Sequence, residues 1–307
     1  MRIAHLGRPN FALRALPGLI GEPTLGIRIV LTGPSMLAKR IVTALILISL
    51  VVAGALYLST PILSLVFAVV VMAAGMEWTQ LAGIRTAMGR LIFIVILGAA
   101  LGLVAWLLHT DPRWGWWIAS AALLWWLLVT IGLFRYRPGQ SPVPGTLAKS
   151  IYGGLVLVPA WTSLVVVHGI EGDGPALLLF LLVLIWVADS GAYFSGRRWG
   201  RTKLAPYISP GKSREGVYGA LAGAAACGLF LAWWRPETGN SMLIILFCLA
   251  LTLISVVGDL FESLMKRQAG MKDSGNILPG HGGVLDRIDS LTAAAPLFLA
   301  GLLMNSP

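Results

Sequence analysis

Four aspartates stand inside or at the edge of long apolar stretches, where an ionised side chain is costly to bury. They are Asp189, Asp259, Asp286 and Asp289. Because a charge inside a membrane costs several kcal/mol, such a residue is a functional candidate by default. Asp286 and Asp289 are three residues apart and would share one helical face. Carboxylate oxygens that meet at one depth predict a pocket for a hard divalent cation such as Mg²⁺.

A second helical face carries charges of both signs. Asp259, Glu262, Ser263 and Lys266 follow i, i+3, i+4, i+7 spacing, which places their side chains on one side of a helix. A purely structural alternative is that these charges form buried ion pairs, such as Asp259 with Lys266. That alternative does not account for the loop that follows, so we favour the cation pocket.

The loop between the two acidic faces is rich in glycine and in cations. Gly280, Gly282 and Gly283 permit close backbone approach and positive φ angles, so that peptide N–H groups can face an anion. His281 could act as a general base or could donate a hydrogen bond to a phosphate or to the backbone. Phosphate binding accounts for the glycines together with four nearby cations, which are Lys266, Arg267, Lys272 and Arg287.

A second loop, Ser209 to Gly216, follows a run of basic residues. Its Gly211-Lys212-Ser213 resembles the end of a Walker A motif, but the earlier glycine of that motif is replaced by Pro206 and no strand is expected before it. We therefore interpret the segment as a Lys-, Arg- and Ser-rich loop in front of a helix N-terminus, a setting that favours an anion.

Membrane helices are the elements that must position these residues. The chain is 57% apolar and 12% charged, with a mean hydropathy of +0.82, whereas roughly a quarter of the residues in a soluble domain are charged. Apolar runs near the length of a bilayer crossing recur along the chain. They predict an all-α polytopic membrane protein with about nine spans, near 41–58, 61–76, 91–108, 115–134, 151–168, 176–195, 217–234, 242–265 and 284–304.

The basic residues predict the orientation of the spans. If the N-terminus is cytoplasmic, all of them except Arg113 and Arg235 fall on the cytoplasmic side. This asymmetry predicts an N-in, C-out chain in the cytoplasmic (inner) membrane. The net charge of +10 lies in these short segments, which favours anionic lipid headgroups over nucleic acid as the partner. Small-residue spacing at Gly219 and Gly223 predicts close helix packing.

The chain divides into three regions on this interpretation: a basic N-terminal tail (1–38), N-terminal transmembrane helices (39–170) and a catalytic transmembrane region (171–307) with cytoplasmic loops 196–216 and 266–285. The weakly periodic tail is expected to be disordered, and the alternative is that Met36 is the true start. Cys227 and Cys248 lie in apolar runs and are interpreted as buried hydrophobic residues.

Several of these motifs together resemble a known family. Ser263-Leu-Met-Lys266-Arg267, then Lys272-Asp273, then Leu278 to Asp289 resembles the signature of the phosphatidate cytidylyltransferases (CDP-diacylglycerol synthases). The likeness extends upstream through Trp186 to Arg197 and through Ser209 to Gly216. It is strong over about 180–290, looser over 36–150 and absent from the first 35 residues. Ser190 and Ser213 stand where threonine is commoner, and each keeps the hydroxyl.

The resemblance implies an enzyme that joins CTP and phosphatidate to give CDP-diacylglycerol and pyrophosphate. It implies a many-span helical fold that often dimerises, with Mg²⁺ as cofactor and a second metal ion as an open alternative. Asp259 and Asp286 would be the principal metal ligands, with Asp289 and Asp189 beside them. Substrate phosphates would be held by the other signature residues, namely Lys212, Lys266, Lys272, Arg287 and, with less defined roles, Ser209, Ser213, Arg267, His281, Gly282 and Gly283.

Two rival functions are kept as alternatives. A transporter would place its charges near the bilayer midplane and would show an internal repeat of broken helices, and the sequence shows neither. A different nucleotide-using membrane enzyme, such as a polyprenol kinase, would share the phosphate-binding features but would act on another lipid.

Overall fold

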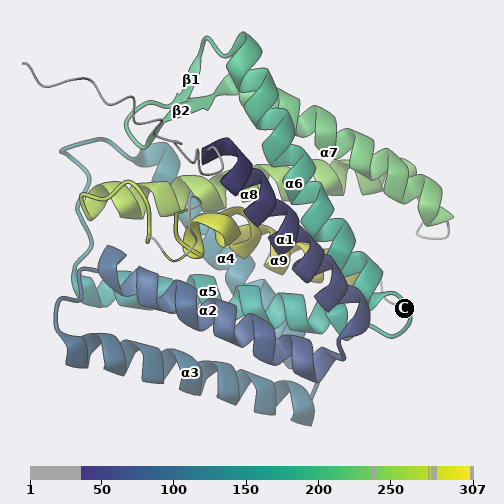
Figure 1. The fold of residues 1–307 in the computed structure, drawn as a ribbon, viewed down its shortest axis with the longest axis horizontal. Helices are drawn as coiled ribbons and strands as arrows, with labels where there is room; N and C mark the ends of the chain where they lie inside the picture. Colours follow the sequence, from purple (N-terminus) through teal and green to yellow (C-terminus); the bar gives the residue numbers. More distant parts are fainter. Residues whose placement is uncertain (1–35, 237–239, 276, 278–281, 305–307) are drawn as a thin grey trace, which may run out of the picture. The chain divides into compact units, whose positions relative to one another are not determined.

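A computed structural model describes residues 36–236, 240–275, 277 and 282–304, so the predicted tail lies almost entirely outside the described residues (Figure 1). Nine helices occupy the described part, each at one of the predicted spans: α1 Met36–Tyr57, α2 Thr60–Leu81, α3 Ala87–Thr110, α4 Trp114–Arg135, α5 Thr146–His168, α6 Gly174–Trp199, α7 Arg214–Trp234, α8 Ser241–Gln268 and α9 Leu285–Met304. Eight of them, α2 to α9, are long and apolar enough to cross a membrane. The predicted all-α polytopic membrane fold is confirmed.

Hydrogen bonds and an ion pair bring several helix ends together. His168, at the end of α5, has Nδ1 2.9 Å from the Thr60 hydroxyl at the start of α2 and Nε2 3.0 Å from the Ala55 carbonyl near the end of α1. At the same level, the Arg235 guanidinium after α7 pairs with Asp173 before α6 at 2.8 Å. The described residues from Met36 onward therefore form one compact unit with two distinct ends.

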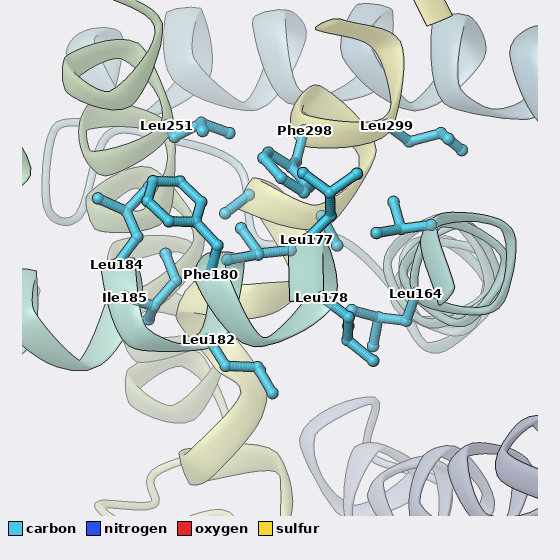
Figure 2. Close-up of a cluster of buried hydrophobic side chains, with 14 of the residues drawn as sticks. Leu164, Leu177, Leu178, Phe180, Leu182, Leu184, Ile185, Leu251, Phe298 and Leu299 are labelled. Carbon is cyan, nitrogen blue, oxygen red and sulfur yellow. The ribbon is translucent and has the colours of Figure 1, made fainter. Parts of the chain in front are cut away.

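One of the two apolar core clusters of this unit is built around α6. Leu178, Leu181 and Leu184 of this helix are fully buried, and Phe180 lies 6.3 Å from Phe298 of α9, measured between ring centroids. Figure 2 shows these side chains meeting Leu251 of α8 in one apolar cluster. Lipid tails are as apolar as leucine, so the association of these helices depends on close packing and not on hydrophobic transfer.

Glycines bring α6 and α7 into direct contact, as predicted from their spacing. A Cβ added at Gly219 would meet the side chain of Ser195 and the backbone of Gly191, and one added at Gly223 would meet Val187. Gly216 is similarly close to the α6 backbone. Since α7 begins at Arg214, within the predicted anion-binding loop, this contact fixes that loop beside the end of α6.

The loop itself holds a short β-hairpin that the sequence analysis did not predict. Strands β1 (Lys203–Ala205) and β2 (Ser209–Ser213) pair antiparallel, with Lys203 opposite Ser213, and the hairpin lies beside one end of α6 in Figure 1. The expectation that no strand precedes Gly211-Lys212-Ser213 was wrong, because β1 lies before this run, which is itself part of β2. The Glu215 carboxylate accepts hydrogen bonds from the backbone N–H of Arg201 and Thr202, which ties the hairpin to α7.

Helix α8 is longer than a bilayer crossing requires. Its 28 residues correspond to about 42 Å at 1.5 Å per residue, against a hydrocarbon core of about 30 Å. The segment before Asp259 is apolar, so the last turns of α8 extend toward the headgroup region. Gly258 packs against the backbone of Asp289, which places the end of α8 against the beginning of α9.

Candidate active site

A cavity of about 510 Å³ that holds several charged side chains lies where α6, β2, α7, α8 and α9 meet. Seven residues predicted from the sequence line it, and they come from segments up to 100 positions apart in the chain. Carboxylates and cations therefore face the same space, near the end of α6, the starts of α7 and α9, and the middle of α8. The seven residues are Asp189, Lys212, Ser213, Asp259, Asp286, Arg287 and Asp289.

One side of the cavity is defined by an ion pair between the hairpin and α8. The ammonium group of Lys212 pairs with the Asp259 carboxylate, and both side chains remain about one-quarter exposed, at 26% and 27%. The Ser263 hydroxyl donates to the other oxygen of Asp259 at 3.3 Å. The pairing of Asp259 with Lys266, which was the structural alternative, was wrong, because Lys266 binds other carboxylates.

Those other carboxylates are Glu262 and Asp286. The Lys266 ammonium lies 3.0 Å from Glu262 and 2.6 Å from Oδ1 of Asp286, and Lys266 is only 8% exposed. The second oxygen of Asp286 accepts hydrogen bonds from the backbone N–H of Ser274 at 3.0 Å and of Gly283 at 2.9 Å. Asp286, at the start of α9, therefore binds α8 through Lys266 and binds the loop between the two helices through Ser274 and Gly283.

The glycine-rich loop has the predicted backbone features. Gly282 has a φ of +82°, and Gly283 has no room for a side chain, because a Cβ there would meet the Ser274 hydroxyl and the Glu77 carboxylate. Gly280 and His281 lie outside the described residues. The N–H groups of Gly283, Val284 and Leu285 do face anions, but these anions are carboxylates of the protein itself. Phosphate binding by Gly282 and Gly283 stays a prediction.

Other predicted residues lie around the cavity without lining it. Arg267 donates to the carbonyls of Ile208 and Met271 at 3.2 and 3.4 Å, which links the end of α8 to the hairpin. Lys272 is exposed on the loop, and Ser209 is half-buried in β2. Ser213, which does line the cavity, has a structural contact as well, because its hydroxyl accepts from the Gly216 N–H and caps α7.

Most residues of the cavity lining were not assigned a role from the sequence, and two of them, Tyr193 and Arg197, contact each other. Arg197 donates from Nη1 to the Tyr193 hydroxyl at 2.9 Å, and both side chains line the cavity. Their i, i+4 spacing beside the aspartate of α6 was a signal that could have identified them, since it places both on one helical face. The hydroxyls of Thr252, Ser255 and Ser290 also reach the lining.

Replacing Gly283 with alanine is expected to reduce activity by about tenfold or more, because a misplacement of about 1 Å can cost 10²-fold. The added methyl group would push Ser274 and Glu77 apart and would shift Asp286, whose carboxylate binds the Gly283 N–H. Gly145→Ala is the matched control, since a Cβ at Gly145 meets nothing within 4 Å. Equal turnover of both variants in detergent would contradict the prediction.

The fold and the cavity define a polytopic membrane protein with a site that holds both carboxylates and cations. Comparison with known proteins is more specific: the chain matches the model of the cytidylyltransferase family over residues 38–304 and belongs to that family. It is accordingly a nucleotidyltransferase.

Individual relatives cover most of the chain. A phosphatidate cytidylyltransferase of Pseudomonas aeruginosa is 42% identical over 267 residues, which make up 86% of this chain and 96% of that protein. The enzyme of the same name in Haemophilus influenzae is 37% identical over 288 residues, with 86% and 97% coverage. That of Brucella suis is 39% identical over 237 residues, with 75% and 81% coverage.

Proposed function

We propose that this protein is a phosphatidate cytidylyltransferase of phospholipid biosynthesis, which converts CTP and phosphatidate to CDP-diacylglycerol and pyrophosphate. The names of its relatives support this reaction. The observation that carries the proposal is the cavity, because it collects carboxylates and cations in one space near the end of α6 and the starts of α7 and α9. A water-soluble nucleotide and a membrane-anchored lipid phosphate could both reach such a place.

In the proposed reaction, a phosphate oxygen of phosphatidate attacks the α-phosphorus of CTP. The bond from the α-phosphorus to the bridging oxygen breaks, and pyrophosphate leaves with the electron pair. Repulsion between two polyanions is the main obstacle, so fixed positive charge lowers the barrier. Lys212 and Arg287 line the cavity and are the cations best placed to supply it. The phosphate nucleophile is already deprotonated near neutral pH and needs no strong general base.

Mg²⁺ is the proposed cofactor, and the residues of the cavity fit it in part. Within the described residues, no three acidic, histidine or cysteine side chains gather as a complete metal site. Mg²⁺, however, is usually bound by one or two carboxylates and completes its shell with water and substrate phosphates. Asp189, Asp259 and Asp289 offer hard oxygen ligands in the cavity. In this structure Asp259 is paired with Lys212, and Asp286 is bound by Lys266 and two N–H groups. A bound Mg²⁺ would neutralise phosphate charge there.

We further propose that the cavity faces the cytoplasm from the inner membrane and that the protein acts there as a homodimer. The basic residues support this orientation, since the described loops at the cavity end carry most of them and the opposite end has Arg113 and Arg235 beside acidic residues. The lipid substrate would remain in the bilayer while CTP arrives from the cytosol.

Cysteine labelling tests this orientation. We expect Gln140→Cys, in the exposed loop after α4, to resist a membrane-impermeant maleimide in intact cells, and Glu171→Cys, after α5, to react. The background would lack Cys227 and Cys248, which lie within α7 and α8. Lysed cells provide the control, because both positions should then be labelled. The reverse pattern in intact cells would invert the orientation.

An assay with labelled CTP and phosphatidate tests the function itself. Detergent-purified protein is expected to form labelled CDP-lipid, to release pyrophosphate in equal amount and to require Mg²⁺. A phosphatidate-free reaction and one with a polyprenol acceptor are the controls. If nucleotide is consumed only with the polyprenol, the protein is a different lipid-modifying enzyme and the proposal is wrong.

A further inference from the structure

A buried carboxylate from the N-terminal half of the chain lies against the signature loop. Glu77, near the end of α2, is only 2% exposed. It is the acidic residue in an otherwise apolar span, yet it does not belong to the cavity lining. A buried carboxylate costs free energy unless hydrogen bonds satisfy it, so the contacts of Glu77 show which groups it positions.

Three donors converge on Glu77. Its Oε1 accepts from the Val284 N–H at 3.0 Å. Its Oε2 accepts from the Leu285 N–H at 2.8 Å and from the Ser274 hydroxyl at 2.9 Å. Leu285 is the first residue of α9 and Val284 directly precedes it, and the first N–H groups of a helix have no partner within the helix. The carboxylate therefore caps α9 and places a negative charge at the positive end of the helix dipole.

The surrounding backbone is shaped to admit this carboxylate. A Cβ at Gly275 or at Gly283 would meet the Glu77 side chain, and Ser274 is fully buried. The same loop segments are also held from the other side, because the backbone N–H groups of Ser274 and Gly283 donate to Asp286. Glu77 and Asp286 thus fix one loop between them, and only Asp286 faces the cavity.

We propose that Glu77 is a positioning residue for the reaction: it sets the register of the loop and of the start of α9, so that Asp286, Arg287 and Asp289 face the substrates. The activity part of this inference rests on the proposed function. Glu77 acts through these residues and makes no substrate contact of its own, which distinguishes it from the residues of the cavity.

Glu77→Gln is the decisive variant, because the two side chains have nearly the same size. Both oxygens of Glu77 accept a backbone N–H, so the amide group of glutamine would face a donor in either orientation. We expect kcat to fall about tenfold or more while the KM for CTP changes by less than about threefold, as displacement of catalytic groups predicts. Glu77→Asp keeps the charge and should retain more activity than the glutamine variant.

Amide hydrogen exchange supplies a readout that does not depend on catalysis. Exchange at Val284 and Leu285 should accelerate in Glu77→Gln, since these N–H groups lose their acceptor, and should remain unchanged in the control Gln80→Ala, an exposed position on the same helix. A Glu77→Gln variant that is as active as the wild type per folded molecule would overturn the inference, whether or not the exchange rates change. A wild-type protein that forms no CDP-lipid would instead refute the proposed function, and the exchange result would still test the role of Glu77.

Discussion

Asp286→Asn is expected to lower turnover by roughly 10²- to 10³-fold, the range found when one preorganised group of an active site is removed. Lys266 binds Oδ1, and the N–H groups of Ser274 and Gly283 bind Oδ2. An asparagine offers one acceptor and one donor, so either orientation of its amide leaves a donor facing a donor. Lys266 would keep Glu262 as its partner, so we expect the helices to insert normally.

The measurement is the rate of CDP-lipid formation per folded molecule, together with the Mg²⁺ concentration that gives half of the maximal rate. Asp111→Asn is the matched control at the opposite end of the helices. The Arg113 guanidinium beside Asp111 donates hydrogen bonds that lower the pKa of this exposed carboxyl, so the control also removes a full negative charge. Near-normal turnover of Asp286→Asn with an unchanged Mg²⁺ requirement would exclude Asp286 from the site.

Lys212→Ala is the second variant with a large expected effect. Its ammonium group is the cation that pairs with Asp259, and its removal would leave the carboxylates of Asp189, Asp259 and Asp289 in the cavity with less compensation. Substrate phosphates would then meet a more negative surface, and the barrier to attack between two anions would rise. We expect kcat/KM for CTP to fall on the order of 10²-fold.

Lys203→Ala provides the comparison for this variant, because Lys203 is exposed on the neighbouring strand and faces Ser213 across the hairpin. It should change kcat/KM by less than about twofold, as surface charges contribute little. Lys212→Arg keeps the charge and should recover part of the activity. If Lys212→Ala and Lys203→Ala behave alike, the hairpin lysine has no special part in substrate binding.

The hydropathy of the chain predicted the number and the approximate positions of the helices, because length and apolarity leave few other structures in a bilayer. The second predicted span was too short because a charged residue interrupts its apolar run. The second span was expected to end at 76, but α2 continues through Glu77 to Leu81. A single sequence cannot show that the partners of this carboxylate come from Ser274, Val284 and Leu285, about 200 positions away.

The sequence predicted which residues belong to the candidate site better than it predicted which of them form ion pairs. Helical spacing placed Asp259 and Lys266 on one face, and both are found there, but their partners are Lys212 and Asp286. Pairings of this kind depend on how α8 packs against α9 and on a hairpin with no alternation of polar and apolar residues. Pattern reasoning detects strands through that alternation, so β1 and β2 gave no signal. The division of the chain between residues 170 and 171 stays a prediction. Glu77 of α2, on one side of this boundary, binds residues on the other side.

Because Glu77 of α2 binds the signature segment, this segment cannot be transferred to another protein on its own. A shortened chain, or a chimera that carried only α6 to α9 into another helical scaffold, would contain every residue of the cavity lining. It would nevertheless lack the acceptor for the Val284 and Leu285 N–H groups and for the Ser274 hydroxyl. Three buried donors without partners would destabilise the loop. Any redesign of this protein must therefore keep α2 and the signature segment together as one structural unit.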